Sequence, residues 1–321
     1  MGQPLADRRL PREFPCVVIM GPTAVGKTDF SIRLAQEIRG EIINFDSVQL
    51  YKYLDIGSAK PTPRERAMVP HHLFDVLYPD EPFDAAEFVV RAASIAKGLL
   101  KRGRVPVFVG GTGFYARALF EGLSPAPKAH PALRDWLKCL EARFGPGYLH
   151  NCLKNLDPVT AHRLPPRDLY RIIRALEVYV LTGTPMSEVF RGNPPRPILS
   201  KDAVKIVLLR PRHELYARID QRVDIMIREG LIDEVKGLMK RGYSPNLKPL
   251  QSLGYKQVVR YLTGDIGLSQ AIYEIKRATR HYAKRQLTWF KGERGAIFIN
   301  PDVASKAKRL WHFIISHDFT R

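Results

Sequence analysis

The sequence predicts an α/β protein, a parallel sheet covered by helices and interrupted by an insertion that is helical throughout. Two observations predict this class. In the first and last thirds of the chain, short apolar runs rich in β-branched residues alternate with helical patterns, as in βαβ units. Between residues 128 and 200, by contrast, there are helical patterns but no convincing strand.

The first part of the sheet core is expected over residues 15–127, after a basic tail over residues 1–14. Residues 16–20 are continuously apolar, as the buried strand of a parallel sheet should be. The other expected elements are a helix ending at Gly40, a strand over 41–45, a helix over 85–102, a strand over 105–109 and a helix through Phe120.

The helical insertion is expected over residues 128–200, with helices near 131–144, 157–164 and 167–182. Asp157 followed by Pro158 is a typical helix start, with the aspartate as N-cap. The sheet core should resume over 201–321. Its expected elements are a strand over 203–209, helices to about residue 291, a strand over 296–299 and a terminal helix from about residue 303.

The chain is strongly basic. Lys and Arg number 51 against 32 Asp and Glu, a formal net charge of +19. Such an excess favours a polyanionic partner, because Lys and Arg side chains neutralise phosphates and release counterions. Charge alone leaves two interpretations open, a nucleic-acid partner or a basic but otherwise ordinary enzyme.

The cysteine pattern and the hydropathy indicate a compartment. Cys16, Cys139 and Cys152 form no CxxC pair, which predicts free thiols in a reducing environment. Residues 1–15 lack the apolar stretch of a secretory signal, and no run approaches the roughly 20 residues that span a bilayer. We therefore expect a cytoplasmic protein with no membrane partner.

Residues Gly21-Pro-Thr-Ala-Val-Gly-Lys-Thr28 match the phosphate-binding pattern GxxxxGK[ST] between a predicted strand and a predicted helix. This context predicts a P-loop NTPase-like core. Backbone N–H groups wrap a phosphate, a lysine contacts it from the side, and the hydroxyl suits Mg²⁺. The predicted phosphate-binding residues are Gly21, Thr23, Ala24, Val25, Gly26, Lys27 and Thr28, with Thr28 as the metal ligand. The pattern does not distinguish a nucleotide from an isoprenoid diphosphate.

Asp46 follows the predicted strand over 41–45. The predicted strand over 105–109, where a phosphoryl-transferring P-loop enzyme carries a carboxylate for Mg²⁺, ends instead in Gly110-Gly111. Three roles are open for Asp46: a metal-shell residue, a general base, or a turn-forming residue. Ligands gather at the carboxyl ends of parallel strands, which favours one of the two functional roles.

A second glycine-rich turn, Gly110-Gly-Thr-Gly113, leads from a predicted strand into a helix. Thr112 lies at its mouth and Arg117 about one helical turn further on. The Arg117 guanidinium could stabilise a leaving diphosphate, and an ordinary surface arginine is the alternative.

Residues 271–291 form an amphipathic helical pattern. Tyr282 and Gln286 fall on its apolar side. The basic side carries Arg277, Arg280, His281, Lys284, Arg285 and Lys291, and the insertion has a similar group in Arg163, Arg167, Arg171 and Arg174 around Tyr170. Such groups fit RNA backbone and unstacked bases, with a solvated charged face as the alternative.

Together these motifs resemble those of the tRNA dimethylallyltransferase (tRNA isopentenyltransferase) family, bacterial type. In chain order, the segments that carry the resemblance are Gly21-Pro-Thr-Ala-Val-Gly-Lys-Thr28, Asp46-Ser-Val-Gln-Leu-Tyr51, Leu54-Asp-Ile-Gly-Ser-Ala-Lys-Pro61, Pro70-His-His-Leu-Phe-Asp75, Val109-Gly-Gly-Thr-Gly-Phe-Tyr115, Arg171-Ile-Ile-Arg-Ala-Leu-Glu177, Leu253-Gly-Tyr-Lys256 and Ala283-Lys-Arg-Gln-Leu-Thr-Trp289. The chain departs from the family pattern at Phe45, Tyr170 and Ser252.

The resemblance implies a reaction. The N6 atom of adenine 37, in the anticodon stem-loop of tRNA, attacks the allylic carbon of dimethylallyl diphosphate, and diphosphate leaves with the help of Mg²⁺. The expected catalytic residues are Asp46 as the base, with Lys27 and Arg117 stabilising the leaving group. The expected partners are tRNA and dimethylallyl diphosphate, and we expect a monomer.

The resemblance and the basic helix also indicate which residues contact tRNA. By resemblance these are Asp46, Ser47, Val48, Gln49, Thr112, Arg134, Tyr170, Arg171, Ile172, Ile173, Arg174, Gln251, Ser252, Leu253, Gly254, Tyr255 and Lys256; the basic helix adds Arg280, Lys284 and Arg285. A basic clamp of this kind is expected because the target base must leave its stack to reach Asp46.

Three other functions fit parts of the sequence. An enzyme that prenylates a free adenine nucleotide would not need the insertion or the basic helix. A non-catalytic P-loop RNA-binding protein would have no use for an acid at position 46. A small-molecule P-loop kinase is disfavoured by the missing carboxylate after residues 105–109 and by the strongly basic charge.

Overall fold

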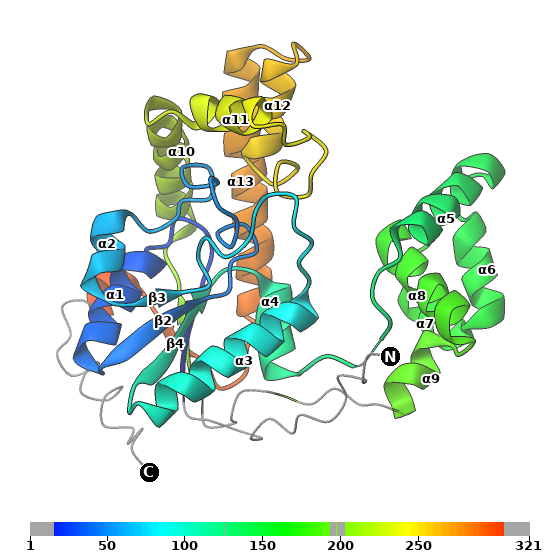
Figure 1. The fold of residues 1–321 in the computed structure, drawn as a ribbon, viewed down its shortest axis with the longest axis horizontal. Helices are drawn as coiled ribbons and strands as arrows, with labels where there is room; N and C mark the ends of the chain where they lie inside the picture. The colour runs from blue at the N-terminus through cyan, green and yellow to red at the C-terminus, as the bar shows by residue number, and fades with distance from the viewer. Residues whose placement is uncertain (1–15, 125, 193–196, 198–202, 305–321) are drawn as a thin grey trace. The chain divides into compact units, whose positions relative to one another are not determined.

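The computed structural model describes residues 16–124, 126–192, 197 and 203–304. The chain separates into two compact units, one formed by Met1–Phe120 with Ile198–Arg321 and the other by Glu121–Pro197 (Figure 1). The expected basic tail over 1–14, and all but the first two residues of the expected terminal helix from residue 303, lie outside the described residues.

The first unit contains a sheet whose described strands are all parallel and follow the order β3-β2-β4-β1-β5-β6. The strands are β1 (Val17–Met20), β2 (Gly40–Asn44), β3 (His71–His72), β4 (Val105–Gly110), β5 (Val204–Leu208) and β6 (Ile297–Ile299). Every residue of β1, which pairs with β4 and β5, is buried, as its continuous apolar sequence predicts. The predicted parallel α/β core is confirmed.

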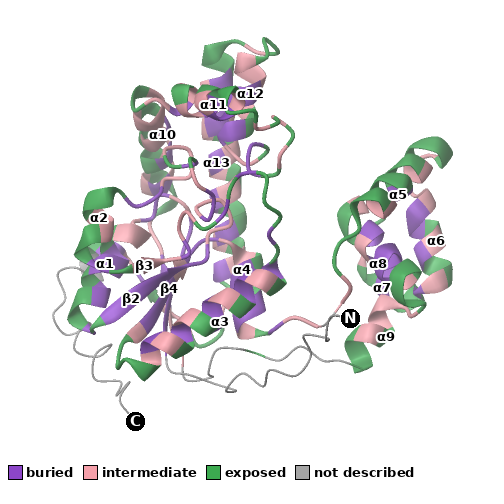
Figure 2. Cartoon of the chain, in the orientation of Figure 1, coloured by how far each residue is buried: buried purple, intermediate pink, exposed green. Residues whose placement is uncertain are grey.

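The first unit also contains helices, some of which pack on the sheet and others on neighbouring helices. They are α1 (Lys27–Glu37), α2 (Pro63–Met68), α3 (Ala85–Lys101), α4 (Gly113–Phe120), α10 (Arg212–Arg228), α11 (Leu231–Lys240), α12 (Tyr255–Leu262), α13 (Leu268–Phe290) and α14 (Pro301–Ala304). Phe30 and Leu34 of α1 share one core cluster with Val17 and Ile19 of β1. Figure 2 shows this burial concentrated in the strands and on the inner sides of the helices. None of the described helices has the length and hydropathy needed to cross a lipid bilayer.

The second unit consists of helices joined by loops, with no strand among its described residues, and covers nearly the stretch expected for the insertion. It consists of α5 (Pro131–Phe144), α6 (Tyr148–Leu156), α7 (Pro158–Arg163), α8 (Leu169–Thr182) and α9 (Met186–Gly192). Its own core includes Leu137, Leu153, Ile172 and Leu176. Asp157 caps α7 by accepting the Thr160 N–H at 3.0 Å, as its sequence predicts.

Four described elements were not expected from the sequence: α2, β3, α6 and α9. α2 begins with a capping box between Thr62 and Glu65, a helix-start signal that is present in the sequence. β3 has two residues, too few for a periodic pattern, and forms because His71 and His72 pair with Ile42 and Ile43 of β2.

Candidate active site

The glycine-rich loop leads from β1 into α1. Gly21 has no room for a side chain, because a Cβ atom there would lie 2.8 Å from the Leu208 carbonyl oxygen. Gly26 precedes α1 with φ +105°, a left-handed conformation that favours glycine. The loop can therefore present backbone N–H groups at a helix N-terminus, where the helix dipole also favours an anion.

Lys27 is the first residue of α1, and its side chain turns back over the loop. Its Nζ donates hydrogen bonds to the carbonyl oxygens of Gly21 at 3.0 Å and Pro22 at 2.9 Å. Burial and the nearby Arg222 guanidinium lower the pKa of Lys27 to about 8, although the Asp46 carboxylate acts in the opposite direction. A bound phosphate would favour the charged form of this lysine.

Asp46 lies in a turn just after β2. Its backbone N–H donates to Asn44 Oδ1 at 2.9 Å, while Asn44 Nδ2 donates to the Leu73 carbonyl at 2.9 Å. Asp46 Oδ1 accepts hydrogen bonds from the N–H groups of Val48 at 2.9 Å and Gln49 at 3.4 Å. One carboxylate oxygen therefore forms the turn. No hydrogen bond to Oδ2 is found within the described part of the chain, which leaves this oxygen able to accept a proton.

The surroundings of Asp46 also make it a stronger base than an exposed aspartate. Burial raises its pKa, and the N–H of Val48, the charge of Lys27 and the N–H of Gln49 oppose this only in part. A pKa closer to neutrality improves general-base catalysis. The described residues include no group of three or more His, Cys, Asp or Glu side chains placed to hold a metal ion.

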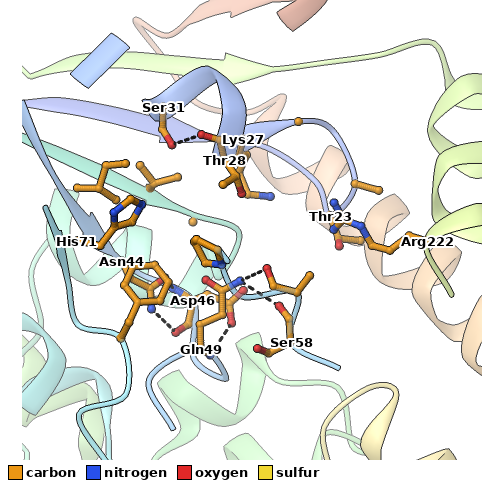
Figure 3. Close-up of a pocket in the computed structure, with 18 of the residues that line it drawn as sticks. Thr23, Lys27, Thr28, Ser31, Asn44, Asp46, Gln49, Ser58, His71 and Arg222 are labelled. Atoms are coloured by element: carbon orange, nitrogen blue, oxygen red, sulfur yellow. Dashed lines mark hydrogen bonds between the residues drawn. The ribbon is translucent and has the colours of Figure 1, made fainter. Parts of the chain in front are cut away.

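The loop and Asp46 line one pocket. In Figure 3, Lys27 and Thr28 face Asp46 and Gln49 across it. Of the predicted site residues, its wall includes Thr23, Ala24, Gly26, Lys27, Thr28, Asp46 and Gln49. The structure thus brings the phosphate-binding loop and the strand-end acid together from two separate segments of the chain.

Arg222 of α10 lines the same pocket and was missed from the sequence. Figure 3 shows it beside Thr23. Arg218, one helical turn earlier, anchors α10 to the loop by donating from Nε to the Ala24 carbonyl at 3.0 Å. Burial and Arg218 lower the pKa of Arg222, but an arginine keeps its charge near neutral pH. Arg117, by contrast, is exposed on α4 and is not among the residues that line this pocket.

The second glycine-rich turn packs closely against its neighbours. A Cβ atom on Gly110 would lie 2.5 Å from the Phe45 ring, and one on Gly111 would lie 2.5 Å from Gln286 Nε2. Gln286 Oε1 accepts the Thr23 N–H at 2.9 Å, and its Nε2 donates to the Gly111 carbonyl at 2.7 Å. Gln286 therefore ties the phosphate-binding loop to this turn.

Tyr282 and Thr112 complete this side of the site. Tyr282 of α13 lines the pocket one helical turn before Gln286. Burial and the charge of Asp46 raise the pKa of its phenol, which therefore stays neutral. Thr112 Oγ1 accepts the Ser47 N–H at 3.2 Å, which links the second turn to the Asp46 turn.

The predicted tRNA-contacting residues of α13 have different surroundings. Lys284 and Arg285 are exposed. Arg280 instead forms an ion pair with Asp220 of α10, at 2.6 and 2.7 Å to the two carboxylate oxygens. The helical wheel placed Arg280 on the outward basic face because it could not include α10.

The residues of the predicted tRNA-contacting stretch over 251–256 also differ in their burial. Gln251 and Lys256 are exposed, and Ser252 and Leu253 are half-buried. Tyr255 is fully buried, and its hydroxyl donates to Glu234 Oε1 at 2.7 Å. Gly254 precedes α12 with φ +92°.

In the insertion, Arg134 and Arg174 converge on the buried carboxylate of Glu177. Arg134 donates from Nε and Nη2 to Glu177, both at 2.8 Å, and the His130 N–H donates to it at 2.7 Å. The Tyr170 ring, 76% exposed, lies 5.9 Å from the Arg134 guanidinium carbon.

The other predicted contacts lie next to this cluster on α8. Arg171 is exposed, whereas Ile172 and Ile173 are buried in the core of the insertion. Any tRNA contact made by this helix therefore comes from the exposed side chains, and the two isoleucines fix the helix beneath them.

We expect Glu177→Ala to lower the free energy of unfolding of the insertion by about 3 kcal/mol, because two arginines lose a buried counter-ion. Burial alone would raise the pKa of Glu177, but hydrogen bonds from Arg134, His130 and Arg174 lower it from 4.5 to about 2. The stabilisation should therefore be complete above about pH 4.5 and decline as the pH falls toward 2.

Amide hydrogen exchange of α8 measures this effect, with Glu188→Ala on the exposed surface of α9 as the matched control. Equal protection in the Glu177 and Glu188 variants would show that the cluster does not stabilise the insertion.

The fold and the site define a class: a P-loop-like protein in which the glycine-rich loop with its lysine, an arginine and a strand-end aspartate line one pocket. Comparison with known proteins agrees. The family model described as IPP transferase matches residues 49–293, and the model described as isopentenyl transferase matches residues 15–70. The tRNA dimethylallyltransferase of Syntrophobacter fumaroxidans is 46% identical over 88% of this chain and 82% of its own length. The tRNA dimethylallyltransferase of Thermotoga maritima is 44% identical over 94% of this chain and 98% of its own length.

Solved structures agree as well. The tRNA isopentenylpyrophosphate transferase of Bacillus halodurans has a TM-score of 0.69 at 39% identity, covering 95% of this chain and 96% of its own. A eukaryotic dimethylallyltransferase, described as acting on tRNA, has a TM-score of 0.79 at 30% identity. The match covers 96% of this chain and 79% of the eukaryotic chain. The chain belongs to the tRNA dimethylallyltransferase family.

Proposed function

We propose that this protein transfers a dimethylallyl group from dimethylallyl diphosphate to N6 of adenine 37 in the anticodon loop of tRNA and releases diphosphate. The observation that carries the proposal is the single pocket shared by the phosphate-binding loop and Asp46. A diphosphate on the loop would hold its allylic carbon within reach of a base-assisted nucleophile.

The diphosphate is held by the backbone N–H groups of the loop, with Lys27 and Arg222 adding two positive charges. The bond from the allylic carbon to the diphosphate oxygen breaks as negative charge builds up on the leaving group. Preorganised donors and cations that meet this charge stabilise the transition state more than the ground state. Arg222 takes the role that the sequence suggested for Arg117, because Arg222 lines the pocket.

Asp46 acts on the acceptor. The lone pair of N6 is delocalised into the adenine ring, so its attack on the allylic carbon is helped when a base removes an N6 proton. Oδ2 of Asp46 is the oxygen proposed to take this proton, while Oδ1 stays bound to the Val48 and Gln49 N–H groups and fixes the carboxylate. No carboxylate after β4 is needed, because no phosphoryl group is transferred.

Mg²⁺ fits this site through Thr28, the last residue of the phosphate-binding loop, which lines the pocket. Mg²⁺ commonly keeps several waters and takes one or two protein oxygens together with substrate phosphates, which suits a pocket with one hydroxyl ligand. When bound, the ion would neutralise part of the charge of the leaving diphosphate.

The tRNA is proposed to bind along exposed cations and polar groups of each unit. The exposed groups are Lys284, Arg285, Gln251 and Lys256 in the sheet unit and Tyr170 and Arg171 in the insertion. Half-buried groups add to them: Thr112 and the turn over 46–49 in the sheet unit, and Arg134 and Arg174 in the insertion. Arginine beside an exposed tyrosine suits an unstacked base, and the remaining cations suit phosphates.

The test is transfer of labelled dimethylallyl group from its diphosphate, with Mg²⁺, to an unmodified tRNA transcript. AMP and ATP serve as competing acceptors, and the same transcript with guanine at position 37 is the matched control. Label on the adenine-37 tRNA alone is the expected result. Label on the free nucleotides, or equal labelling of both transcripts, would refute the proposed acceptor.

A further inference from the structure

A single carboxylate outside the pocket, that of Glu234, accepts hydrogen bonds from the backbone of residues 55–57, which lead into the pocket wall. Glu234, in the first turn of α11, accepts the N–H of Asp55 at 2.9 Å and of Ile56 at 2.7 Å through Oε2. Through Oε1 it accepts the N–H of Gly57 at 3.1 Å. Three successive amides, far from Glu234 in the sequence, are thus held by a single side chain.

Tyr255 fixes that carboxylate from the other side. Its hydroxyl donates to Glu234 Oε1 at 2.7 Å, so each of the two carboxylate oxygens accepts two hydrogen bonds. This uses the full acceptor capacity of a carboxylate. The fit also requires Gly57, because a Cβ atom there would lie 2.5 Å from the Tyr255 ring and 2.8 Å from Leu231.

The stretch held by Glu234 continues into the pocket wall. Ser58 and Ala59 line the pocket, and their carbonyl oxygens accept hydrogen bonds from Gln49 Nε2 at 2.9 and 3.0 Å. Figure 3 shows Gln49 between Asp46 and Ser58. The N–H of Gln49 donates to Asp46 Oδ1 at 3.4 Å. A continuous chain of contacts therefore runs from Glu234 through residues 55–59 and Gln49 to Asp46.

The C-terminal end of the stretch, next to Lys60, is held by residues close to it in the sequence. Lys60, almost fully buried, donates from Nζ to the Tyr51 carbonyl and to Asp55 Oδ1, both at 2.6 Å, and pairs with Asp75. These partners all lie between residues 51 and 75. Glu234 of α11 and Tyr255 of α12 provide the polar contacts described above that tie this segment to these two helices.

We propose that Glu234, aligned by Tyr255, is a positioning residue for the transfer reaction: it sets residues 55–59 so that Gln49 holds the Asp46 carboxylate in its working orientation. The inference rests on the proposed function, with Asp46 as the base. The alternative is that Glu234 only stabilises the fold, in which case its loss would lower stability without a selective effect on turnover.

The test uses Glu234→Gln in the full chain. A glutamine side chain keeps the shape but offers one acceptor oxygen, so at least one of the four hydrogen bonds is lost. We expect kcat for transfer to tRNA to fall about 10- to 100-fold, because a misplacement of about 1 Å can cost about 100-fold in rate. The KM for dimethylallyl diphosphate and the Kd for tRNA should change by less than about 3-fold, since the variant leaves the P-loop and the exposed cations intact.

Asp233→Asn is the matched control, because Asp233 is the other acidic residue in the first turn of α11 and is exposed. It should leave kcat within about 2-fold of wild type, which would exclude a general effect of charge near this helix end. Tyr255→Phe removes the hydroxyl that donates to Glu234 and also accepts a backbone hydrogen bond from Ser58, so it loosens the same stretch from the other side. It should lower kcat about 3- to 10-fold. It decides the question if the Glu234 variant does not fold.

A double-mutant cycle with Gln49→Ala separates positioning from fold stability. If Glu234 acts through Gln49, the combined variant should be far less impaired than the product of the two single effects. Multiplicative effects, or a Glu234→Gln variant with unchanged kcat, would refute the inference. Wild-type protein that transfers no dimethylallyl group would instead refute the proposed function.

Discussion

We expect Asp46→Asn to lower kcat for prenyl transfer to tRNA by a factor of about 100 to 10,000, the usual contribution of a positioned general base. Asparagine can keep the turn, because its side-chain oxygen can still accept the N–H groups of Val48 and Gln49 that now bind Oδ1. It cannot accept the N6 proton. The measurement is single-turnover transfer of labelled dimethylallyl group at saturating tRNA.

The binding steps should survive this exchange, with the Kd for tRNA within about 3-fold of wild type, because the carboxylate acts mainly in the transition state. Asp84→Asn is a suitable control: Asp84 also accepts a backbone N–H, at the start of α3, but lies outside the pocket wall. Its rate should match wild type. If Asp46→Asn were equally active, Asp46 would be only a turn-forming residue and another group would have to take the proton.

The pH dependence gives the same assignment a second check. The reaction needs Asp46 without its proton, and burial raises the pKa of Asp46. The wild-type kcat/KM should therefore fall on the acid side at a higher pH than an ordinary aspartate would give, and this fall should be absent from the residual activity of the asparagine variant.

The parts of the site that local chemistry determines could be read from the sequence. The phosphate-binding loop needs glycine at Gly21 for close approach and at Gly26 for its left-handed backbone, and both requirements leave a signature in eight residues. Likewise, the continuous apolar run of β1 predicts a strand buried on both faces. In such cases the sequence neighbours of a residue decide its structure.

The parts that were missed depend on packing between distant segments. The helical wheel correctly turned Tyr282 and Gln286 toward the apolar side of α13, but nothing in the period of a helix says that this side meets the phosphate-binding loop. Arg222 enters the pocket because Leu215 and Ile219 pack α10 into the core shared with α1 and β1, and Arg218 ties it to the loop. Arg280 was assigned to the outward face because its partner, Asp220, belongs to another helix.

Lys27→Ala is expected to lower kcat/KM for dimethylallyl diphosphate by a factor on the order of 100 to 1,000, the effect of removing one preorganised donor from a site of developing negative charge. Much of this loss should appear as a raised KM, since the lysine contacts the diphosphate in the ground state as well. Steady-state kinetics at saturating tRNA measures both. A KM and kcat close to wild type would mean that the diphosphate does not bind at this loop.

Lys27→Arg tests the charge of Lys27 rather than its presence. With a pKa of about 8, the wild-type Lys27 loses its proton as the pH rises through that value, so kcat/KM should decline above about pH 8. An arginine at this position stays charged across the accessible range, so the variant, whatever activity its bulkier side chain allows, should show no such decline. Because kcat/KM reports on the free enzyme, the comparison is independent of how far a bound diphosphate raises the pKa of Lys27 again. If the same alkaline decline appeared in the arginine variant, a group other than Lys27 would cause it, and Lys27 would keep its proton over the whole pH range.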